Sequence, residues 1–287
     1  MQVLESHTVL HQKIPIRIQE YLVGIFKTVA TKSAIKKAIK KELILVNDSP
    51  TSTAHIVVDG DIIILLQFEE ESNYKQLQLD LEVIYEDDYL AIINKPAGIL
   101  VSGNKFKTVD SALLQNLQKS RQSDAVRPRP VHRLDYPTTG CLLVGKTSSS
   151  IQALNELFEQ KKIQKTYHAI VIGQLNSSGV INSEIDGKQS ESHFQVIETV
   201  KSNRFEFLTL VELSPKTGRR HQLRIHLASL GNPILGDQEY GKEDLILKGK
   251  GLYLHASSLQ FSHPFSQEQL EINSPIPLKF KKIFEYI

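Results

Sequence analysis

Three segments rich in β-branched and aromatic residues follow one another in the second half of the chain, and this succession constrains the fold more than any other feature. They read KTYHAIVIGQ (165–174), HFQVIETV (193–200) and RFEFLTLVEL (204–213), and such residues favour strands. No helical pattern separates them, whereas parallel neighbours need a long crossover that is usually a helix. The sequence therefore predicts a largely antiparallel sheet and an α+β fold rather than a doubly wound one.

The rest of this region combines shorter strands and helices. The expected elements, in chain order, are two strands joined by an acidic turn at 81–95, a helix at 109–120, a polar loop at 120–130, a buried strand at 141–146, a helix at 150–162, a helix at 219–231 and a strand pair at 252–264. In the helix at 219–231, Leu223, Leu227 and Leu230 share one face. Gly231 is its expected C-terminal cap, and Pro233 prevents its continuation.

Residues 1–66 are expected to form a separate small α/β unit. A helix is predicted from Thr31 to Leu43, because Ile35, Ile39 and Leu43 recur every four residues. Most of its remaining surface carries four lysines, Lys36, Lys37, Lys40 and Lys41. A short strand with a turn follows at 43–50, and a strand, an Asp-Gly turn and a strand follow at 55–66. The polar stretch 67–80 has no apolar period and is predicted to be a linker, so that a second domain spans 81–287.

Composition excludes some classes of protein. Hydrophobic residues make up 40% and charged residues 23%, as in ordinary globular proteins. The single cysteine, Cys141, allows no intramolecular disulfide, which fits a reducing cytoplasm. The first thirty residues lack the pattern of a secretion signal, and no apolar run is long enough to span a membrane. The net charge of +2 does not by itself indicate a nucleic-acid partner, so the local distribution of charge matters more.

The stretch HRLDYPTTG (132–140) places three charged or ionisable residues at the edge of an apolar run. A lone aspartate before Tyr-Pro is usually a turn former, because its side chain bonds to the backbone two residues on. Here His132 and Arg133 precede Asp135, and an adjacent arginine favours an ionised carboxylate. Asp135 is therefore a candidate catalytic carboxylate.

A second cluster, within residues 216–237, holds six basic or potentially basic groups in eleven positions. A solvated helix end would explain Arg219 and Arg220. It explains Arg224 poorly, because Arg224 lies within the leucine-bearing stretch and an unpaired buried charge is costly. We expect Arg224 to pair with a carboxylate, for which Asp135 is the natural candidate.

Two further positions have both a structural and a functional interpretation. NKPAGILVSG (94–103) is either a strand ending in a Pro-Gly turn or, with Lys95 and the loop to Lys107, a phosphate contact. Tyr167 is a packing residue unless a planar ring is needed to stack on a base. Phosphate-binding glycine loops and metal-ligand spacings are missing, so the chemistry is expected to need neither a nucleotide cofactor nor a metal.

These motifs together resemble the RluA-type RNA pseudouridine synthases. The resemblance covers roughly residues 81–287 and rests on NKPAGILV, HRLD with TTG, GRRHQLRIHLASLGNPILGD and LHASSLQFSHP, in the family's order. It implies a catalytic domain with a mixed, largely antiparallel sheet. The unit at 1–66 looks like the small RNA-binding domain known from ribosomal small-subunit protein four, and its lysines would bind RNA phosphates.

The resemblance also implies roles for individual residues. Asp135 matches the essential aspartate, Tyr167 the tyrosine that lies against the target base, and Arg224 the arginine that pairs with the aspartate. The remaining matches are to substrate-contacting positions, where Arg133 fills the gap left by the displaced nucleotide and Leu223 walls the pocket, with His132, Lys95 and Arg220 nearby. Thr139 stands where a serine is common and Arg220 where a threonine is common, so RNA contacts at Arg220 can differ.

The implied function is the isomerisation of uridine to pseudouridine in RNA, with large-subunit ribosomal RNA favoured over transfer RNA by family analogy. A monomer in the cytoplasm would suit an enzyme that docks on a large RNA. The alternatives are an RNA-binding or ribosome-assembly protein built on a synthase scaffold, and a carboxylate-based glycoside hydrolase. The hydrolase usually needs two carboxylates flanking the bond, whereas the HRLD segment offers one acid among bases.

Overall fold

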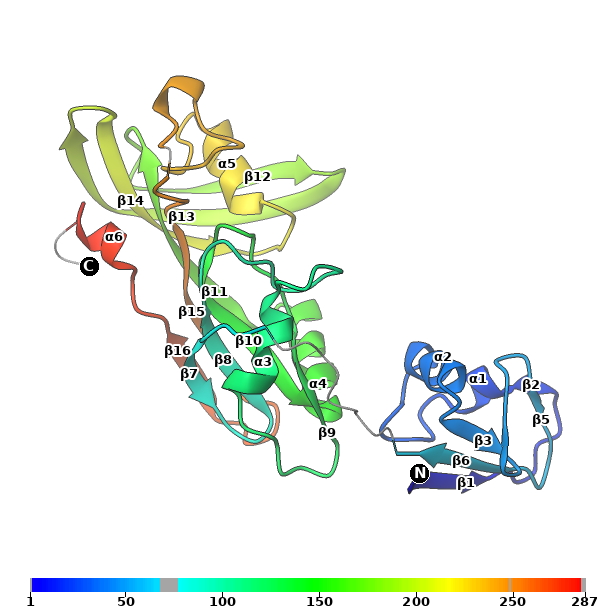
Figure 1. The fold of residues 1–287 in the computed structure, drawn as a ribbon. Coiled ribbons are helices and arrows are strands. Elements are labelled where there is room, and N and C mark those ends of the chain that lie inside the picture. The colour runs from blue at the N-terminus through cyan, green and yellow to red at the C-terminus, as the bar shows by residue number, and fades with distance from the viewer. Residues whose placement is uncertain (1, 68–76, 248, 285–287) are drawn as a thin grey trace. The chain divides into compact units, whose positions relative to one another are not determined.

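The computed structural model describes residues 2–67, 77–247 and 249–284. The chain divides into two compact units, Met1–Tyr74 and Lys75–Ile287, which are drawn in Figure 1. Most of the predicted linker 67–80 lies outside the described residues. Its described end already belongs to the second unit, because the Leu79 carbonyl accepts hydrogen bonds from Gln115 and Asn116. Among the described helices, none is long and apolar enough to cross a membrane.

The N-terminal unit is a small antiparallel sheet covered by helices. The sheet order is β1 (Val3–Thr8), β6 (Ile62–Leu66), β3 (Ile44–Val46) and β4 (Ser49–Pro50), while β2 (Ile16–Arg17) pairs with β5 (Ile56–Val57) and is followed by α1 (Ile18–Tyr21). The predicted lysine helix is α2 (Lys32–Lys40), which begins after Thr31 accepts the Ala34 amide at 3.2 Å. It ends before Leu43 because Glu42 takes a left-handed conformation (φ 57°). The two strands predicted at 55–66 both form, but they belong to different sheets.

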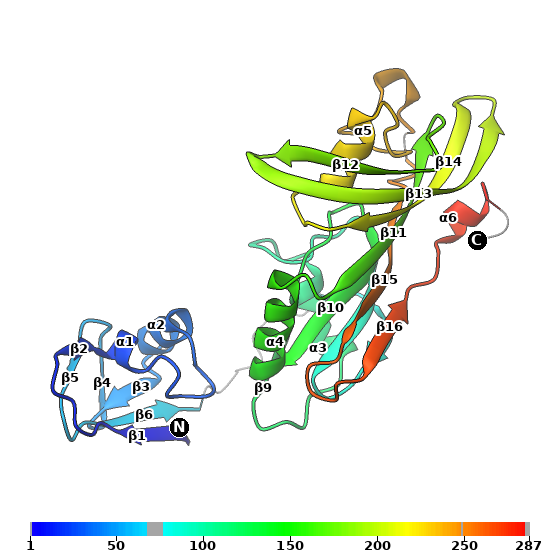
Figure 2. The same ribbon diagram turned by 180° about the vertical axis from the view of Figure 1, so that it is seen from behind.

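The second unit is built on a ten-stranded sheet. Figures 1 and 2 draw this sheet from opposite sides. Its main path runs β12 (Ser178–Ile185), β13 (Lys188–Ser202), β14 (Glu206–Pro215), β11 (Gln164–Ile172), β15 (Leu254–Ser262), β10 (Thr139–Thr147), β8 (Leu90–Lys95) and β7 (Glu82–Glu86), with β16 (Gln269–Asn273) on β15 and β9 (Ala125–Pro130) on β10. Within the described residues, β10 and β15 are parallel and the other pairs are antiparallel. The predicted α+β fold with a largely antiparallel sheet is confirmed.

Two local predictions were wrong, and one strand was not predicted. Residues 125–130, expected as loop, form β9, since prolines are tolerated in a strand that pairs on one side only. Strand β12 was missed because its sequence SGVINSEI is mostly polar and buries only Ile181 and Ile185. The segment 252–264 forms one strand, β15, and not a pair; its late partner is β16.

Helices pack on this sheet and position the candidate site. They are α3 (Val109–Asn116), α4 (Ser148–Glu159), α5 (Gln222–Ser229) and the short α6 (Leu278–Lys281), with a 3₁₀ turn at Glu243–Leu245. α5 lies beside β12 and β13 in both ribbon views. Leu223 and Leu227 are buried as predicted, whereas Leu230 is 44% exposed. His226 ties α5 to β13 through hydrogen bonds with Ser190 (2.8 Å) and Ser192 (2.9 Å), so the helix that carries Arg224 is fixed on the sheet.

Candidate active site

Asp135 lies on a tight turn between β9 and β10. Its carbonyl accepts the Thr138 amide at 3.1 Å, and the preceding Leu134 is buried in the core. Gly140 follows at φ 110°, where a Cβ atom would lie 2.1 Å from the Ala256 carbonyl oxygen, so only glycine allows β10 to approach β15 this closely. The Asp135 side chain is 19% exposed. A carboxylate is thus presented to solvent from a turn that is anchored on both sides.

Lys95 builds this turn and does not contact phosphate, so the prediction for Lys95 was wrong. Its side chain is 0% exposed. Nζ donates to the carbonyl oxygens of Pro96 (2.9 Å), Tyr136 (3.4 Å) and Thr138 (2.8 Å). Burial lowers the pKa of Lys95 to about 8, although the negative charge of Asp135 acts in the opposite direction. The ammonium group of Lys95 donates to three backbone carbonyls because β8 ends inside the domain, where these carbonyls surround it.

Tyr167 lies on β11, close enough to Asp135 for the carboxylate charge to act on its pKa. It pairs with Leu213 on β14 and with Ala256 on β15, and it packs against two core clusters. Burial, together with the charges of Asp135 and Cys141, raises the pKa of Tyr167, so the phenol stays protonated. Leu223 is 7% exposed and belongs to one of those clusters. The strand and α5 therefore bring an aromatic ring and an aliphatic side chain to the same core.

Arg224 does not form its ion pair with Asp135 as predicted; its partner is Asp237. Nε lies 2.7 Å from Oδ2 of Asp237 and Nη2 lies 2.7 Å from Oδ1, with side chains 5% and 0% exposed. Nη2 also reaches Glu239 at 3.2 Å. A planar guanidinium fits one carboxylate in this two-bond manner. Asp135 still acts on Arg224 through space, because its charge helps to raise the pKa of Arg224.

The Arg224–Asp237 pair is held charged by its own hydrogen bonds. Burial alone would raise the pKa of Asp237, but Arg224 and the amides of Glu239 and Tyr240 donate to its carboxylate and bring the pKa below its usual range. Burial likewise acts to lower the pKa of Arg224, and the bond to Asp237 together with the charges of Asp237, Asp135 and Glu239 outweighs it. The pair is thus a buried, hydrogen-bonded ion pair behind the site.

Four residues that sequence reasoning did not assign surround Asp135 and Arg224. They are His221, Asp237, Glu239 and Tyr240. His221 Nε2 lies 3.8 Å from Oδ1 of Asp135. One signal for Asp237 was available, because it closes the apolar stretch NPILGD after the arginine-bearing helix, where an acid needs a cationic partner.

His132 was predicted to contact substrate, and the structure places it in the scaffold. Its Nε2 accepts the Leu143 amide at 2.9 Å, and its ring packs on Phe158 with centroids 4.9 Å apart. An accepting nitrogen requires a neutral ring. Burial and the nearby charge of Lys165 lower the pKa of His132 to about 3. His132 comes two residues after the end of β9, and its bond to Leu143 joins it to β10.

The lowered pKa of His132 predicts a loss of stability in acid. As the pH falls below 6.5, the unfolded chain binds the proton and the folded chain does not, so the free energy of unfolding declines until the pH reaches about 3. His132→Gln, whose amide oxygen can accept the Leu143 N–H, should show a shallower decline. Urea unfolding near neutral pH and at about pH 5 measures this. Other buried histidines, such as His255, keep some of the dependence, and equal declines in both proteins would contradict the assignment.

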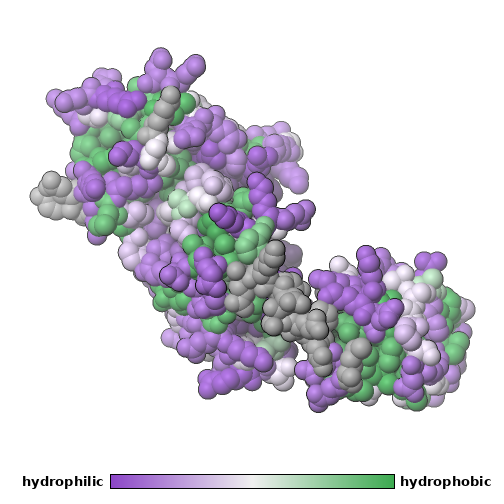
Figure 3. All heavy atoms as spheres, in the orientation of Figure 1, coloured by the Kyte–Doolittle hydropathy of each residue, from purple (hydrophilic) through white to green (hydrophobic). Residues whose placement is uncertain are grey.

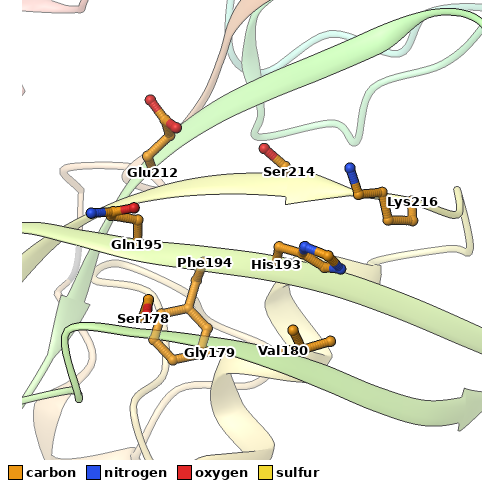
Figure 4. Close-up of a pocket in the computed structure, with 9 residues that line it drawn as sticks. All are labelled: Ser178, Gly179, Val180, His193, Phe194, Gln195, Glu212, Ser214 and Lys216. Carbon is orange, nitrogen blue, oxygen red and sulfur yellow. The ribbon is translucent and has the colours of Figure 1, made fainter.

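The remaining predicted residues lie on the surface. Arg133 and Arg220 are exposed, as are Lys36, Lys37 and Lys40 of α2 and Lys41 directly after it. A shallow pocket elsewhere in the sheet, drawn in Figure 4, contains none of the predicted site residues. It is lined by side chains of β12, β13 and β14 and the start of the following loop, among them His193, Glu212 and Lys216. Within the described residues, no group of three or more His, Cys, Asp or Glu side chains is arranged to hold a metal ion.

Comparison with known proteins supports one family. A family model described as RNA pseudouridylate synthase matches residues 89–229. Ribosomal large subunit pseudouridine synthase C of Vibrio parahaemolyticus is 33% identical, covering 93% of this chain and 91% of that protein. The protein of that name from Pasteurella multocida is 33% identical over 98% of this chain and 93% of its own length. The solved structure of human RNA pseudouridylate synthase domain containing 4 is 25% identical, with a TM-score of 0.56 over 69% of this chain and 90% of that chain.

The chain belongs to the RNA pseudouridylate synthase family. It is an RNA pseudouridine synthase, an isomerase that converts uridine to pseudouridine within RNA. The family predicted from the HRLD segment and its companion motifs is therefore confirmed. The family model begins at residue 89, so the likeness of the N-terminal unit to ribosomal small-subunit protein four stays a prediction.

Proposed function

We propose that this enzyme forms pseudouridine in large-subunit ribosomal RNA and that Asp135 is its catalytic carboxylate. The target is supported by near-full-length similarity to proteins named ribosomal large subunit pseudouridine synthase C. The role of Asp135 is supported above all by its position on an anchored turn, within 3.8 Å of His221 and close enough to Tyr167 and Arg224 to act on their pKa values.

The reaction needs a carboxylate and no redox chemistry. The N1–C1′ bond of the uridine breaks, the uracil turns, and a C5–C1′ bond forms; C5 loses its hydrogen as a proton, and N1 gains one. Asp135 either attacks C1′ or removes a sugar proton, and both roles require the ionised form. Arg224 and Lys95 are the cations close enough to Asp135 for its charge to raise their pKa values.

The target base must leave its stack before its sugar can be reached. This extrusion costs a few kcal/mol, which contacts to the base and the backbone offset. Tyr167 is proposed to lie against the extruded uracil beside Leu223, and the exposed Arg133 to occupy the vacated space. The loop before α3 offers further RNA contacts, because Phe106 is 46% exposed between the exposed Lys105 and Lys107.

The proposed function is tested by release of tritium from RNA labelled at C5 of uridine. Unmodified large-subunit ribosomal RNA and unmodified transfer RNA are supplied to the wild-type enzyme in parallel. Release from the ribosomal RNA, followed by mapping of the modified position, supports the proposal. Release from transfer RNA alone would replace the proposed target with the transfer RNA alternative.

The exposed lysines of α2 are proposed to bind RNA phosphates. Figure 3 shows hydrophilic side chains gathered on this part of the N-terminal unit. The double variant Lys36→Gln/Lys37→Gln should bind RNA more weakly and with a shallower salt dependence. The slope of log K against log salt should fall by about 1.4 to 1.8, since each of the two phosphate contacts contributes about 0.7 to 0.9. Filter binding at several salt concentrations gives the slope.

A matched control separates this effect from net charge. Lys281→Gln/Lys282→Gln removes the same charge from another exposed lysine pair and should leave the slope unchanged. The α2 variant keeps its fold, because glutamine is as good a helix former as lysine. Equal slopes for the two double variants would show that α2 does not bind RNA.

A further inference from the structure

His221 has a backbone conformation that calls for an explanation. It precedes α5 with φ 54° and ψ 21°, in the left-handed region that side-chain-bearing residues rarely occupy. Its side chain makes no capping hydrogen bond to the helix. Such conformations persist where the surrounding contacts require them, and they are frequent at functional sites. The contacts of the imidazole ring indicate why His221 holds this backbone conformation.

The ring of His221 lies between two carboxylates and a phenol. Nδ1 lies 3.0 Å from the hydroxyl oxygen of Tyr240 and 3.4 Å from Oε1 of Glu239. Nε2, on the opposite edge, lies 3.8 Å from Oδ1 of Asp135. The side chain of His221 is 14% exposed, so the ring is held inside the site with Nδ1 toward Tyr240 and Glu239 and Nε2 toward Asp135.

This surrounding determines where the ring carries its proton. The Tyr240 hydroxyl bonds to Glu239 as well as to Nδ1. When the imidazole is neutral and this hydroxyl donates to Nδ1, the proton is left on Nε2. When the ring is protonated, Nδ1–H donates to Glu239, and Nε2 again carries a proton. The third state, with a bare Nε2, would place a lone pair toward the Asp135 carboxylate and is disfavoured. Both favoured states direct an N–H from Nε2 toward Asp135.

The charges around Asp135 explain why an N–H from His221 matters for the orientation of its carboxylate. Arg224, the cation predicted to pair with Asp135, has its guanidinium occupied by Asp237. The groups in contact with His221 are Asp135 from the turn before β10 and Glu239 and Tyr240 from the loop after α5. Arg224 lies on α5 with its guanidinium over the Tyr240 ring, and Arg220 precedes His221 in the chain. The charge of Asp135 in turn acts on the pKa values of Lys95, Tyr167 and Arg224. Among the described residues, His221 is the side chain within ion-pair distance of Asp135.

We propose that His221 is a positioning residue, whose Nε2–H orients the carboxylate of Asp135 for reaction with the extruded uridine. The proposal rests on the catalytic role of Asp135. The 3.8 Å separation shortens to a hydrogen bond when the substrate is bound, as contacts at free active sites commonly do. Tyr240 and Glu239 hold the ring, and the left-handed backbone aims it.

Two amide substitutions isolate this contact. His221→Asn tolerates the left-handed backbone and keeps a polar atom where Nδ1 lies, but it cannot reach Asp135. His221→Gln places its amide N–H where Nε2 lies. We expect His221→Asn to lower kcat by about 10- to 100-fold with KM for RNA nearly unchanged, since a small misplacement of a reacting group costs this much. His221→Gln should recover most of the loss. His193→Asn and His193→Gln, at a histidine paired with Glu191 at 2.7 Å and lining the pocket of Figure 4, are the matched controls and should behave as wild type.

The pH profile of Tyr240→Phe gives a readout that a structural role would not change. At low pH the protonated ring still bonds to Glu239, so kcat should match wild type. At higher pH the neutral ring has lost the donor to Nδ1, and kcat should fall behind. Parallel profiles, wild-type kcat in His221→Asn, or no recovery in His221→Gln would overturn the proposal. Asp135→Asn in the same assay separates the two claims: turnover there refutes the role of Asp135, whereas an inactive Asp135→Asn beside an active His221→Asn refutes the role of His221 alone.

Discussion

Asp135→Asn is expected to fold and to bind RNA but to show no detectable pseudouridine formation. Asparagine has the same shape as aspartate, and the turn depends on the Thr138 amide and on the Lys95 ammonium, which donates to the Thr138 carbonyl, rather than on the Asp135 side chain. A carboxamide is neither a nucleophile for C1′ nor a base for a sugar proton. The rate should fall below about one-hundredth of wild type, the least that removing such a group costs. Tritium release from C5-labelled RNA measures it.

The control for this variant is Asp186→Asn, in the turn between β12 and β13. Asp186 has φ 51°, a conformation that asparagine accepts readily, and it lies outside the site. It loses the same charge and should keep wild-type activity. If Asp135→Asn released tritium at a rate close to that of Asp186→Asn, another residue would carry the chemistry.

Arg224→Met is expected to destabilise the second unit by about 3–5 kcal/mol, the largest stability effect of any substitution considered. The reason is Asp237, whose side chain is 0% exposed and would be left charged without its partner. Methionine fills much of the same volume, so lost packing contributes less than the unpaired carboxylate. Urea unfolding at neutral pH gives the change in unfolding free energy.

A second substitution separates stability from catalysis. Adding Asp237→Asn to Arg224→Met removes the buried charge, while the amide oxygen still accepts the amides of Glu239 and Tyr240. The double variant should recover most of the lost stability but not the lost activity, because the charge that acts on Asp135 stays absent. Full recovery of activity would assign Arg224 a purely structural role. No recovery of stability would show that the loss came from packing.

Local patterns predicted most elements of the second unit. The hairpin of β7 and β8, the helices α3, α4 and α5, and the core strands β10, β11, β13 and β14 form where their residue patterns placed them. Strand β12 was not predicted, because it has one solvated face and buries only two isoleucines, so its hydrophobic pattern is weak. Local propensity works where side chains next to one another in the chain meet the same environment.

The candidate site shows where that reasoning ends. The sequence by itself determined the family, the motif HRLDYPTTG that contains Asp135, and the need of Arg224 for a carboxylate partner. Only the tertiary structure decided that this partner is Asp237. It also decided that the ammonium group of Lys95 donates to backbone carbonyls, among them that of Thr138, 43 positions later in the chain. Pairing of buried charges depends on which distant segments meet and on how many acceptors surround each group. No local pattern encodes that, and His221 gained its place beside Asp135 in the same way.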